Sequence, residues 1–195
     1  MSSTNRGSSY KDKTITDYYV TPISEILKFF AAVVEEESDI FSGSVVDPAA
    51  GGDPAHPASY PEALSEIGIP ESMVSTIDIR EDSRAAIKGK SYLEMELAEK
   101  PNLIITNPPF IIAQEFIEKA LKDVRDGGYV VMLLRLNFFG SSRRKKLWEK
   151  SMPKYVFVHH QRMSFTDDSA TDSVEYMHAV WKKGENPKSS KLFVI

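Results

Sequence analysis

Cysteine is absent from this chain of 195 residues. There can therefore be no disulfide framework, thiolate metal site or cysteine nucleophile, and a reducing compartment suits the protein. Long apolar runs are also missing, because residues 29–34 and 129–134 fall far short of the ~18 that a membrane span needs. The first fifteen residues are polar and lack the apolar core of a signal peptide. We therefore expect a soluble cytoplasmic protein with no membrane partner.

The composition is that of a folded protein. Hydrophobic residues make up 42% of the chain and the formal net charge is only −4, which excludes disorder along the whole length. At ~100 to 200 residues per domain the length allows one domain. We expect a flexible tail over residues 1–13, which are polar, and a single domain over residues 14–195.

Strands alternate with helices along the chain. Apolar spacing predicts helices over 22–35, 62–67 and 116–124, with a helical turn or two over 83–88. Short apolar runs bounded by Gly, Pro or Asn predict strands over 44–47, 74–78, 103–106, 129–134, 155–159 and 175–181. This alternation is typical of a mostly parallel sheet covered on both faces, with ligands beyond the carboxyl ends of the strands.

The sharpest motif is Asn107-Pro108-Pro109-Phe110, directly after the strand at 103–106. An adenine amine is a poor nucleophile because its lone pair is delocalised into the ring. The amide oxygen of Asn107 and the carbonyl of Pro108 can accept its two N–H bonds and favour an attacking geometry. The prolines fix the direction of that carbonyl, and Phe110 offers a flat face for an extruded base. A plain proline turn is the alternative.

Acidic residues end two further strands. Asp47 precedes the Gly51-Gly52 turn, where backbone N–H groups can approach a ligand closely and the carboxylate can face an ammonium group. Asp78 ends the next strand, where a carboxylate can accept hydrogen bonds from ribose hydroxyls. Taken alone, the glycines could form only a turn, and Asp78 could cap a helix.

With these three features in order on successive strands, the chain resembles the class I S-adenosylmethionine-dependent methyltransferases with an N-P-P-[FYW] motif. It looks most like the small N6-adenine DNA methyltransferases of phages and prophages. The resemblance runs from about Asp17 to Trp181. Its supporting segments are 19–22, 47–53, 78–80, 134–139, 162–166 and 175–176. Asp53 stands where the family has a second glycine, and Ser91 where it has an acidic residue.

The resemblance implies a Rossmann-like α/β fold with a mostly parallel seven-stranded sheet, helices on both faces and an antiparallel edge hairpin. It implies S-adenosyl-L-methionine as cofactor and the family's catalytic motif in residues 107–110. The cofactor-binding residues that it implies are Tyr19, Thr21, Pro22, Asp47, Pro48, Ala49, Gly51, Asp78, Ile79, Tyr92 and Asn107. The implied substrate is double-stranded DNA with its target base flipped out, in a bacterial or phage-infected host.

Two further features bear on the substrate. If the last two strands form a hairpin, their connection over 162–173 lies on the same rim as Asn107, and Phe165 could cover the second face of the base. An aromatic plug over the sheet edge is the alternative. Residues 141–162 carry seven basic side chains and one acidic one, and Arg143, Arg144, Lys145 and Lys146 are candidate phosphate contacts. A solvated helix face is the alternative.

Other interpretations remain open. The same chemistry could act on RNA or on a protein glutamine, and a non-catalytic nucleic-acid-binding module on a degenerate fold is a third hypothesis. No metal site is expected, because His159 and His160 are adjacent in a strand and point to opposite faces. The chain leaves no room for a separate target-recognition domain, so we expect specificity to come from the rim loops, from a second copy in a homodimer, or from a protein partner.

Overall fold

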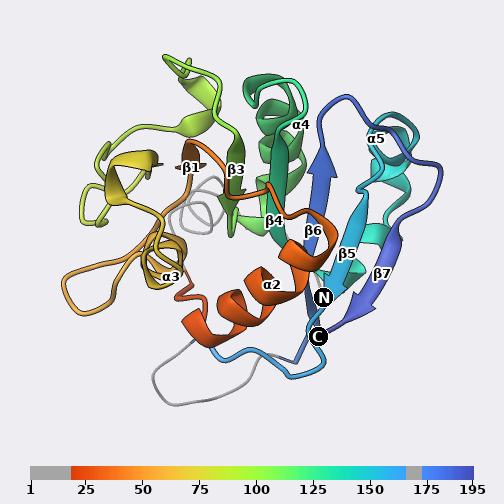
Figure 1. The fold of residues 1–195 in the computed structure, drawn as a ribbon, viewed down its shortest axis with the longest axis horizontal. Coiled ribbons are helices and arrows are strands. Elements are labelled where there is room, and N and C mark those ends of the chain that lie inside the picture. Colours follow the sequence, from red (N-terminus) through yellow and green to blue (C-terminus); the bar gives the residue numbers. More distant parts are fainter. Residues whose placement is uncertain (1–18, 166–172) are drawn as a thin grey trace, which may run out of the picture.

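A seven-stranded mixed sheet organises the computed structural model, which describes residues 19–165 and 173–195. The sheet order is β2-β1-β3-β4-β6-β5-β7 (Figure 1). The strands are β1 (Val45–Asp47), β2 (Val74–Thr76), β3 (Leu103–Thr106), β4 (Tyr129–Arg135), β5 (Tyr155–Val158), β6 (Tyr176–Lys182) and β7 (Lys191–Val194). The strands β2, β1, β3 and β4 pair in parallel, so their carboxyl ends meet at one edge of the sheet.

The expected antiparallel hairpin is present but does not form the edge. Strand β6 pairs antiparallel with both β4 and β5, and β7 then pairs in parallel with β5 on the outside. The short run at 191–194 carries Lys191 and has two of its apolar side chains exposed, Leu192 at 59% and Val194 at 66%. This run was not predicted as a strand from the sequence.

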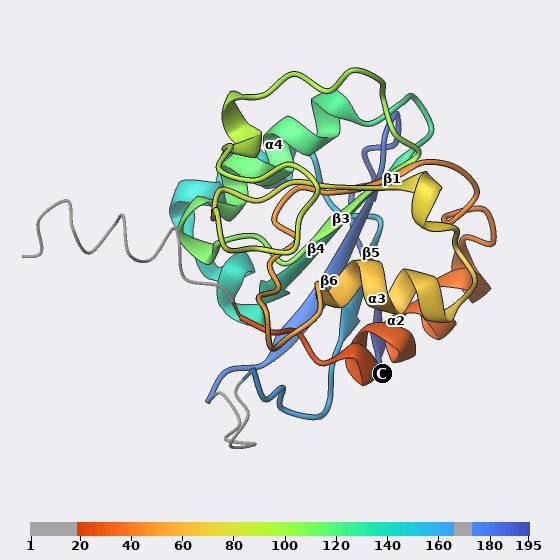
Figure 2. The same cartoon turned by 90° about the vertical axis from the view of Figure 1, so that its left-hand side faces the viewer.

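Helices cover both faces of the sheet, as expected. The helices α2 (Ile23–Glu36) and α3 (Ser59–Glu66) lie on one face, and α4 (Ala113–Asp123) with the short α5 (Lys145–Lys150) on the other. Figure 2 shows α4 and the α2–α3 pair on opposite sides of the strands. Residues of β3 and β4 alternate between the two cores: Leu103 and Ile105 pack toward α2, while Ile104 packs toward α4.

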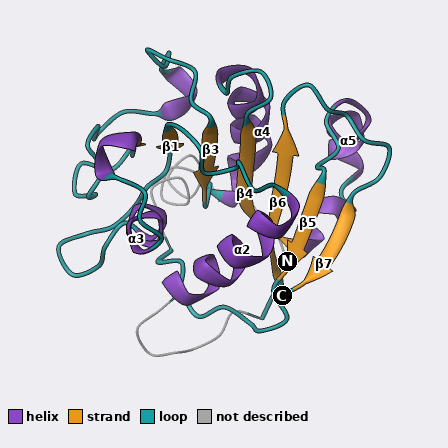
Figure 3. Ribbon diagram, in the orientation of Figure 1, coloured by secondary structure: helices purple, strands orange, loops and turns teal. Residues whose placement is uncertain are grey.

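The segment 83–88 is not helical, contrary to the expectation from its sequence. It folds back along β2, where Ile87 forms a parallel bridge with Ile77 and Ala86 N donates to Thr76 Oγ1 at 2.8 Å. Backbone bonds to the neighbouring strand thus replace helical ones. Short 3₁₀ turns lie over 71–73, 92–94, 110–112, 136–140 and 142–144. Figure 3 distinguishes the helices, strands and loops of the whole fold.

The amino end of the sheet, opposite the ligand edge, is held by Glu37. Its carboxylate accepts hydrogen bonds from Tyr129 at 2.7 Å and Tyr155 at 2.9 Å, and it pairs with Lys154 at 2.7 Å and Lys182 at 2.8 Å. Burial opposes ionisation of this carboxyl, but the four donors outweigh it and lower its pKa to about 2. The cluster ties α2 to three strands.

Candidate functional site

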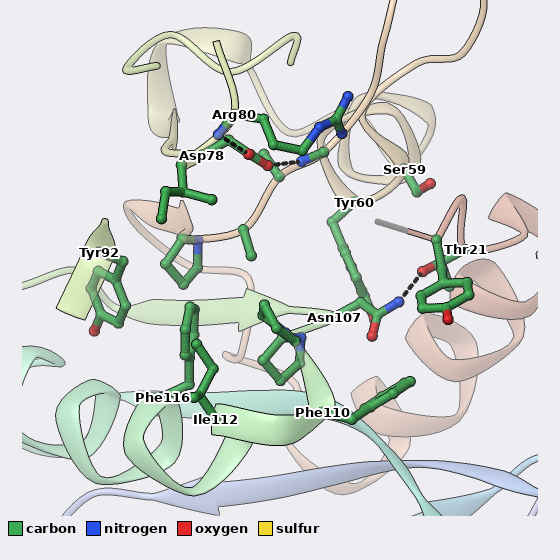
Figure 4. A pocket seen from close by; sticks show the side chains of 18 of the residues that line it. Thr21, Ser59, Tyr60, Asp78, Arg80, Tyr92, Asn107, Phe110, Ile112 and Phe116 are labelled. Carbon is green, nitrogen blue, oxygen red and sulfur yellow. Dashed lines mark hydrogen bonds between the residues drawn. The ribbon is translucent and has the colours of Figure 1, made fainter. Parts of the chain in front are cut away.

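A cavity of about 310 Å³ opens at the carboxyl ends of the parallel strands. Each strand contributes the residues that follow it: the turn after β1, Asp78 beyond β2, the Asn107–Phe110 motif after β3 and Arg135 at the end of β4. Figure 4 shows the side chains of several of these residues around one space, with Thr21 entering from the segment before α2. The fold therefore brings together residues that are far apart in the chain.

The glycine turn after β1 is held open by Asp78. The Gly51 amide donates to Asp78 Oδ2 at 2.7 Å and the Arg80 amide to Oδ1 at 2.8 Å. Gly52 has a φ of +74°, and a Cβ there would lie 3.0 Å from the Ala58 backbone nitrogen, so a side chain would be strained as well as crowded. Arg84 clamps the same turn, because its side chain donates to the carbonyls of Asp53 and Pro54.

Asn107 is oriented by Thr21. The Asn107 Nδ2 donates to Thr21 Oγ1 at 3.1 Å, and Thr21 is itself buried (Figure 4). An amide that donates through its nitrogen presents its oxygen in another direction. The Asn107 Oδ1 has no hydrogen-bond partner within residues 19–165 and 173–195, so it is available to accept from a bound group.

Asp47 lies beneath the cavity and does not line it. The side chain is fully buried, Oδ1 accepts from the Ala49 amide at 3.2 Å, and Oδ2 has no hydrogen-bond partner in the described part of the chain. Burial raises the pKa of Asp47 to about 7, and the nearby charge of Asp78 adds to the rise. The cavity lining thus does not include the Asp47 carboxylate, which was expected to face an ammonium group.

An aromatic cluster surrounds Phe110. Tyr19 stacks on it with ring centroids 6.3 Å apart, and the Arg135 guanidinium lies 4.8 Å from its ring centroid. Phe165 is 8% exposed and contacts Tyr19 and Tyr176 at 5.6 and 4.8 Å between centroids. Phe165 does not line the cavity, so it does not form the expected second face of a base clamp. It packs instead as an aromatic plug against Tyr19 and Tyr176.

The basic segment is less uniform than its sequence suggests. Arg143, Lys145 and Lys146 are exposed, but the Arg144 guanidinium lies 3.7 Å from the Phe138 ring centroid and donates to the Phe138 carbonyl at 2.9 Å. Lys154 belongs to the Glu37 cluster at the other end of the sheet. Three of the four candidate phosphate-binding side chains are thus accessible to a ligand, while Arg144 has a packing role.

Of the residues predicted to bind a cofactor, nine line the cavity: Tyr19, Thr21, Pro48, Ala49, Gly51, Asp78, Ile79, Tyr92 and Asn107. Pro22 does not, because it precedes the first turn of α2 and its carbonyl accepts from the helix amides. Tyr92 is buried, donates to Asp123 at 2.8 Å and packs on Phe116. Its side chain forms a wall, with Ser91 beside it.

Several residues that line the cavity were not named as candidates from the sequence, among them Arg135 and Tyr60. Arg135 ends β4, and its place one residue beyond the predicted strand was the signal that could have revealed it. Tyr60 is the second residue of α3 and lines the cavity from the other side. No local pattern distinguishes it, since its partner in space, His178, is 118 residues away. Only the fold brings them together.

The described residues contain no group of three or more His, Asp or Glu placed to hold a metal ion. Within the same ranges no helix is long and apolar enough to cross a membrane.

Comparison with known proteins relates this geometry to solved structures. A class I S-adenosylmethionine-dependent methyltransferase from Listeria monocytogenes aligns with a TM-score of 0.64 over 90% of this chain and 65% of its own, at 15% identity. An RNA methyltransferase from Pyrococcus horikoshii aligns with a TM-score of 0.60 at 15% identity, covering 86% and 88%. The methyltransferase subunit of a type I restriction–modification system from Streptococcus thermophilus gives 0.62 at 12%, covering 92% and 48%.

The chain has a Rossmann-like methyltransferase fold. At 12 to 16% identity the likeness concerns the fold alone. The chain spans less than two thirds of the Listeria protein and about half of the Streptococcus subunit. No family model matches the sequence, and no curated protein matches it. In this fold the cavity described above lies at the carboxyl ends of the strands, where the Asn107–Phe110 motif and the glycine turn face each other.

Proposed function

We propose that the chain is an S-adenosylmethionine-dependent methyltransferase acting on the N6 amine of adenine in DNA. The observation that carries the proposal is the oriented amide of Asn107, whose nitrogen is held by Thr21 and whose oxygen is left to accept. The amide shares one cavity with the glycine turn and with two prolines that fix the backbone after it. Such an arrangement suits a planar amine better than a hydroxyl or thiol, because two acceptors match the two N–H bonds of an amine.

The chain's residues fit the proposed cofactor. Gly51 and Gly52 line the cavity with backbone and no side chain, and each Asp78 oxygen that holds the loop keeps a second lone pair for a ribose hydroxyl. Tyr92 and Ile79 supply apolar walls for a base. When bound, S-adenosylmethionine supplies a methyl group already activated by its sulfonium charge. The protein's contribution is then positioning and electrostatics.

The residues act on the amine as follows. Asn107 Oδ1 and the Pro108 carbonyl accept the two N–H bonds, which draws the nitrogen lone pair out of conjugation and aims it. The Phe110 ring supports the base by stacking. Tyr19 now occupies the space beside Phe110, so entry of a base requires this exposed tyrosine to move aside. Pro109 keeps the turn in place.

DNA is favoured as substrate by the exposed Arg143, Lys145 and Lys146 close to the end of β4. Similarity to restriction–modification subunits agrees with DNA as substrate. Similarity to an RNA methyltransferase keeps RNA as a second candidate. We further propose that residues 14–195 act as one catalytic domain in the cytoplasm of a bacterial or phage-infected cell. Target choice would come from the rim loops, a second copy or a partner protein.

Parallel assays of methyl transfer test this function. Purified protein with tritiated S-adenosylmethionine is given double-stranded DNA, RNA of the same sequence, and a glutamine-containing protein. We expect label in adenine of DNA, recovered as N6-methyladenine after hydrolysis. Label in RNA or protein alone would replace the substrate assignment. No transfer to any of the three, with the protein folded and the cofactor bound, would favour the non-catalytic hypothesis.

A further inference from the structure

A continuous chain of buried hydrogen bonds runs from the cavity to the protein surface. Tyr60, which lines the cavity, contacts His178 Nε2 through its hydroxyl at 2.9 Å. The His178 Nδ1 lies 2.8 Å from His159 Nε2, and His159 Nδ1 lies 3.0 Å from Glu25 Oε2. Glu25 pairs at its other oxygen with the exposed Lys28 at 2.7 Å. Four titratable side chains from α2, α3, β6 and the residue after β5 thus form one line.

The carboxylate sets the direction of this line. Because the Glu25 carboxylate only accepts, His159 must donate from Nδ1 and accept at Nε2. His178 then donates from Nδ1 and accepts at Nε2, so the Tyr60 hydroxyl donates to it. Every proton points from Tyr60 toward Glu25, and the Tyr60 oxygen keeps its lone pairs to accept a further proton.

Burial keeps both imidazoles neutral in the resting protein, so each has one ring nitrogen without a proton. Burial lowers the pKa of His178 well below its usual value and lowers that of His159, although Glu25 opposes the second shift. His178 is fully buried, with Phe29 stacked on its ring at 4.1 Å and Tyr60 edge-on. The other charged groups that His159 faces are Lys28 and His160, both of which disfavour its protonation. The line is neutral at rest except at its carboxylate end.

We propose that Tyr60, His178, His159 and Glu25 form a proton relay that receives the proton released when the amine is methylated. The proposal rests on the function proposed above. Methyl transfer requires the amine nitrogen to lose one proton, and neither Asn107 nor Pro108 can take it, since an amide oxygen is not a base at neutral pH. Tyr60 lines the same cavity as Asn107 (Figure 4), and its oxygen is the first acceptor with a path behind it.

The transfer balances as follows. As the methyl group bonds to the amine nitrogen, an N–H bond of the amine breaks and its proton reaches the Tyr60 oxygen, so that methyl transfer and proton loss share one step. The Tyr60 proton moves to His178 Nε2, and the His178 Nδ1 proton moves to His159 Nε2. Tyr60 and His178 end neutral, and the positive charge that came with the methyl group ends on His159, beside the Glu25 carboxylate. After the product leaves, the protons return by the same route and one is lost through Tyr60 to water in the cavity.

Two substitutions separate a relay from a structural role. Glu25→Gln keeps an oxygen that accepts from His159 but removes the charge that stabilises the imidazolium. Tyr60→Phe removes the entry point. We expect each to slow single-turnover methyl transfer at least 10-fold, with cofactor affinity within twofold of wild type, and the double variant to be no slower than the slower single. Tyr155→Phe is the matched control, because it likewise removes a hydrogen-bonded tyrosine hydroxyl, here one that donates to Glu37 at the opposite edge of the sheet.

A second readout does not depend on turnover. Nitrogen-15 NMR of the histidine rings should find His159 and His178 each protonated at Nδ1 in the resting protein. Protonation of His178 at Nε2 would reverse the line and overturn the relay. Wild-type rates in Glu25→Gln and Tyr60→Phe would overturn it while leaving the proposed function intact. A wild-type protein that methylates none of the three substrates would instead refute the proposed function, and the relay with it.

Discussion

At the scale of single residues, the cavity depends on side chains held by polar partners outside it. Thr21 fixes the Asn107 amide, and Asp78 fixes the glycine turn through two backbone amides. Asp78 was expected to bind ribose or to cap a helix. The structure gives it a loop-holding role that is compatible with the first. Asp47 differs, since it is buried below the cavity with a raised pKa and one oxygen without a hydrogen-bond partner in the described chain.

Asp47 predicts a pH dependence of stability. Its folded-state pKa of about 7 lies above its usual value of 3.8, so the folded protein holds a proton between these values that the unfolded chain has lost. Unfolding free energy should therefore fall as pH rises from about 4 to 7, by at most ~1.4 kcal/mol per pH unit. Asp47→Asn should lack this contribution. Urea denaturation at pH 5, 6 and 7 should show the unfolding free energy of Asp47→Asn rising relative to that of wild type with each increase in pH.

Asp126→Asn, which changes a carboxylate with 96% of its side chain exposed, serves as the control and should follow wild type. A constant difference between Asp47→Asn and wild type across this range would show that Asp47 is ionised throughout, and that its burial does not affect its charge.

At the scale of elements, the sequence predicted what local patterns determine. Strand β3 matches its predicted bounds, and α2, α4 and β4 match within a few residues, because their buried side chains repeat at the period of the element. The segment 83–88 was predicted wrongly and strand β7 was missed, since both are held by backbone bonds to another segment, 83–88 to Ile77 and β7 to β5. Their own side chains carry no matching period.

The basic segment gives a prediction for one element. Replacing Arg143, Lys145 and Lys146 with Ala should weaken DNA binding and reduce its salt dependence by roughly 0.9 in log–log slope for each phosphate that the variant no longer neutralises. Arg144 is left in place because it packs on Phe138. Titrations of labelled DNA at several salt concentrations measure the slope. Lys122 and Lys188, both exposed, are replaced together as a control, and an unchanged slope in the triple variant would identify 143–146 as an ordinary solvated face.

At the scale of the whole molecule, the sheet order makes the site. Parallel pairing of β1, β2, β3 and β4 brings the residues after Asp47, Thr76, Thr106 and Arg135 to one edge. Motifs after strands therefore predicted most of the cavity lining. The place of Tyr60 and the burial of Asp47 and Phe165 were not predictable, because each depends on packing between elements. The hydrogen-bonded line through His159 and His178 likewise forms only when α2, α3, β5 and β6 pack together.

The central claim is that the Asn107 amide oxygen orients an amine for methylation, and Asn107→Ala tests it most directly. The change removes this oxygen and leaves Pro108, Pro109 and Phe110 to shape the turn, so fold and cofactor binding should persist. Asn137→Ala, at an exposed asparagine after β4, is the control. With circular dichroism confirming the fold, methyl transfer to DNA should fall ~10²- to 10³-fold in Asn107→Ala and stay unchanged in Asn137→Ala. A folded Asn107→Ala protein that methylates DNA at the wild-type rate would contradict the account.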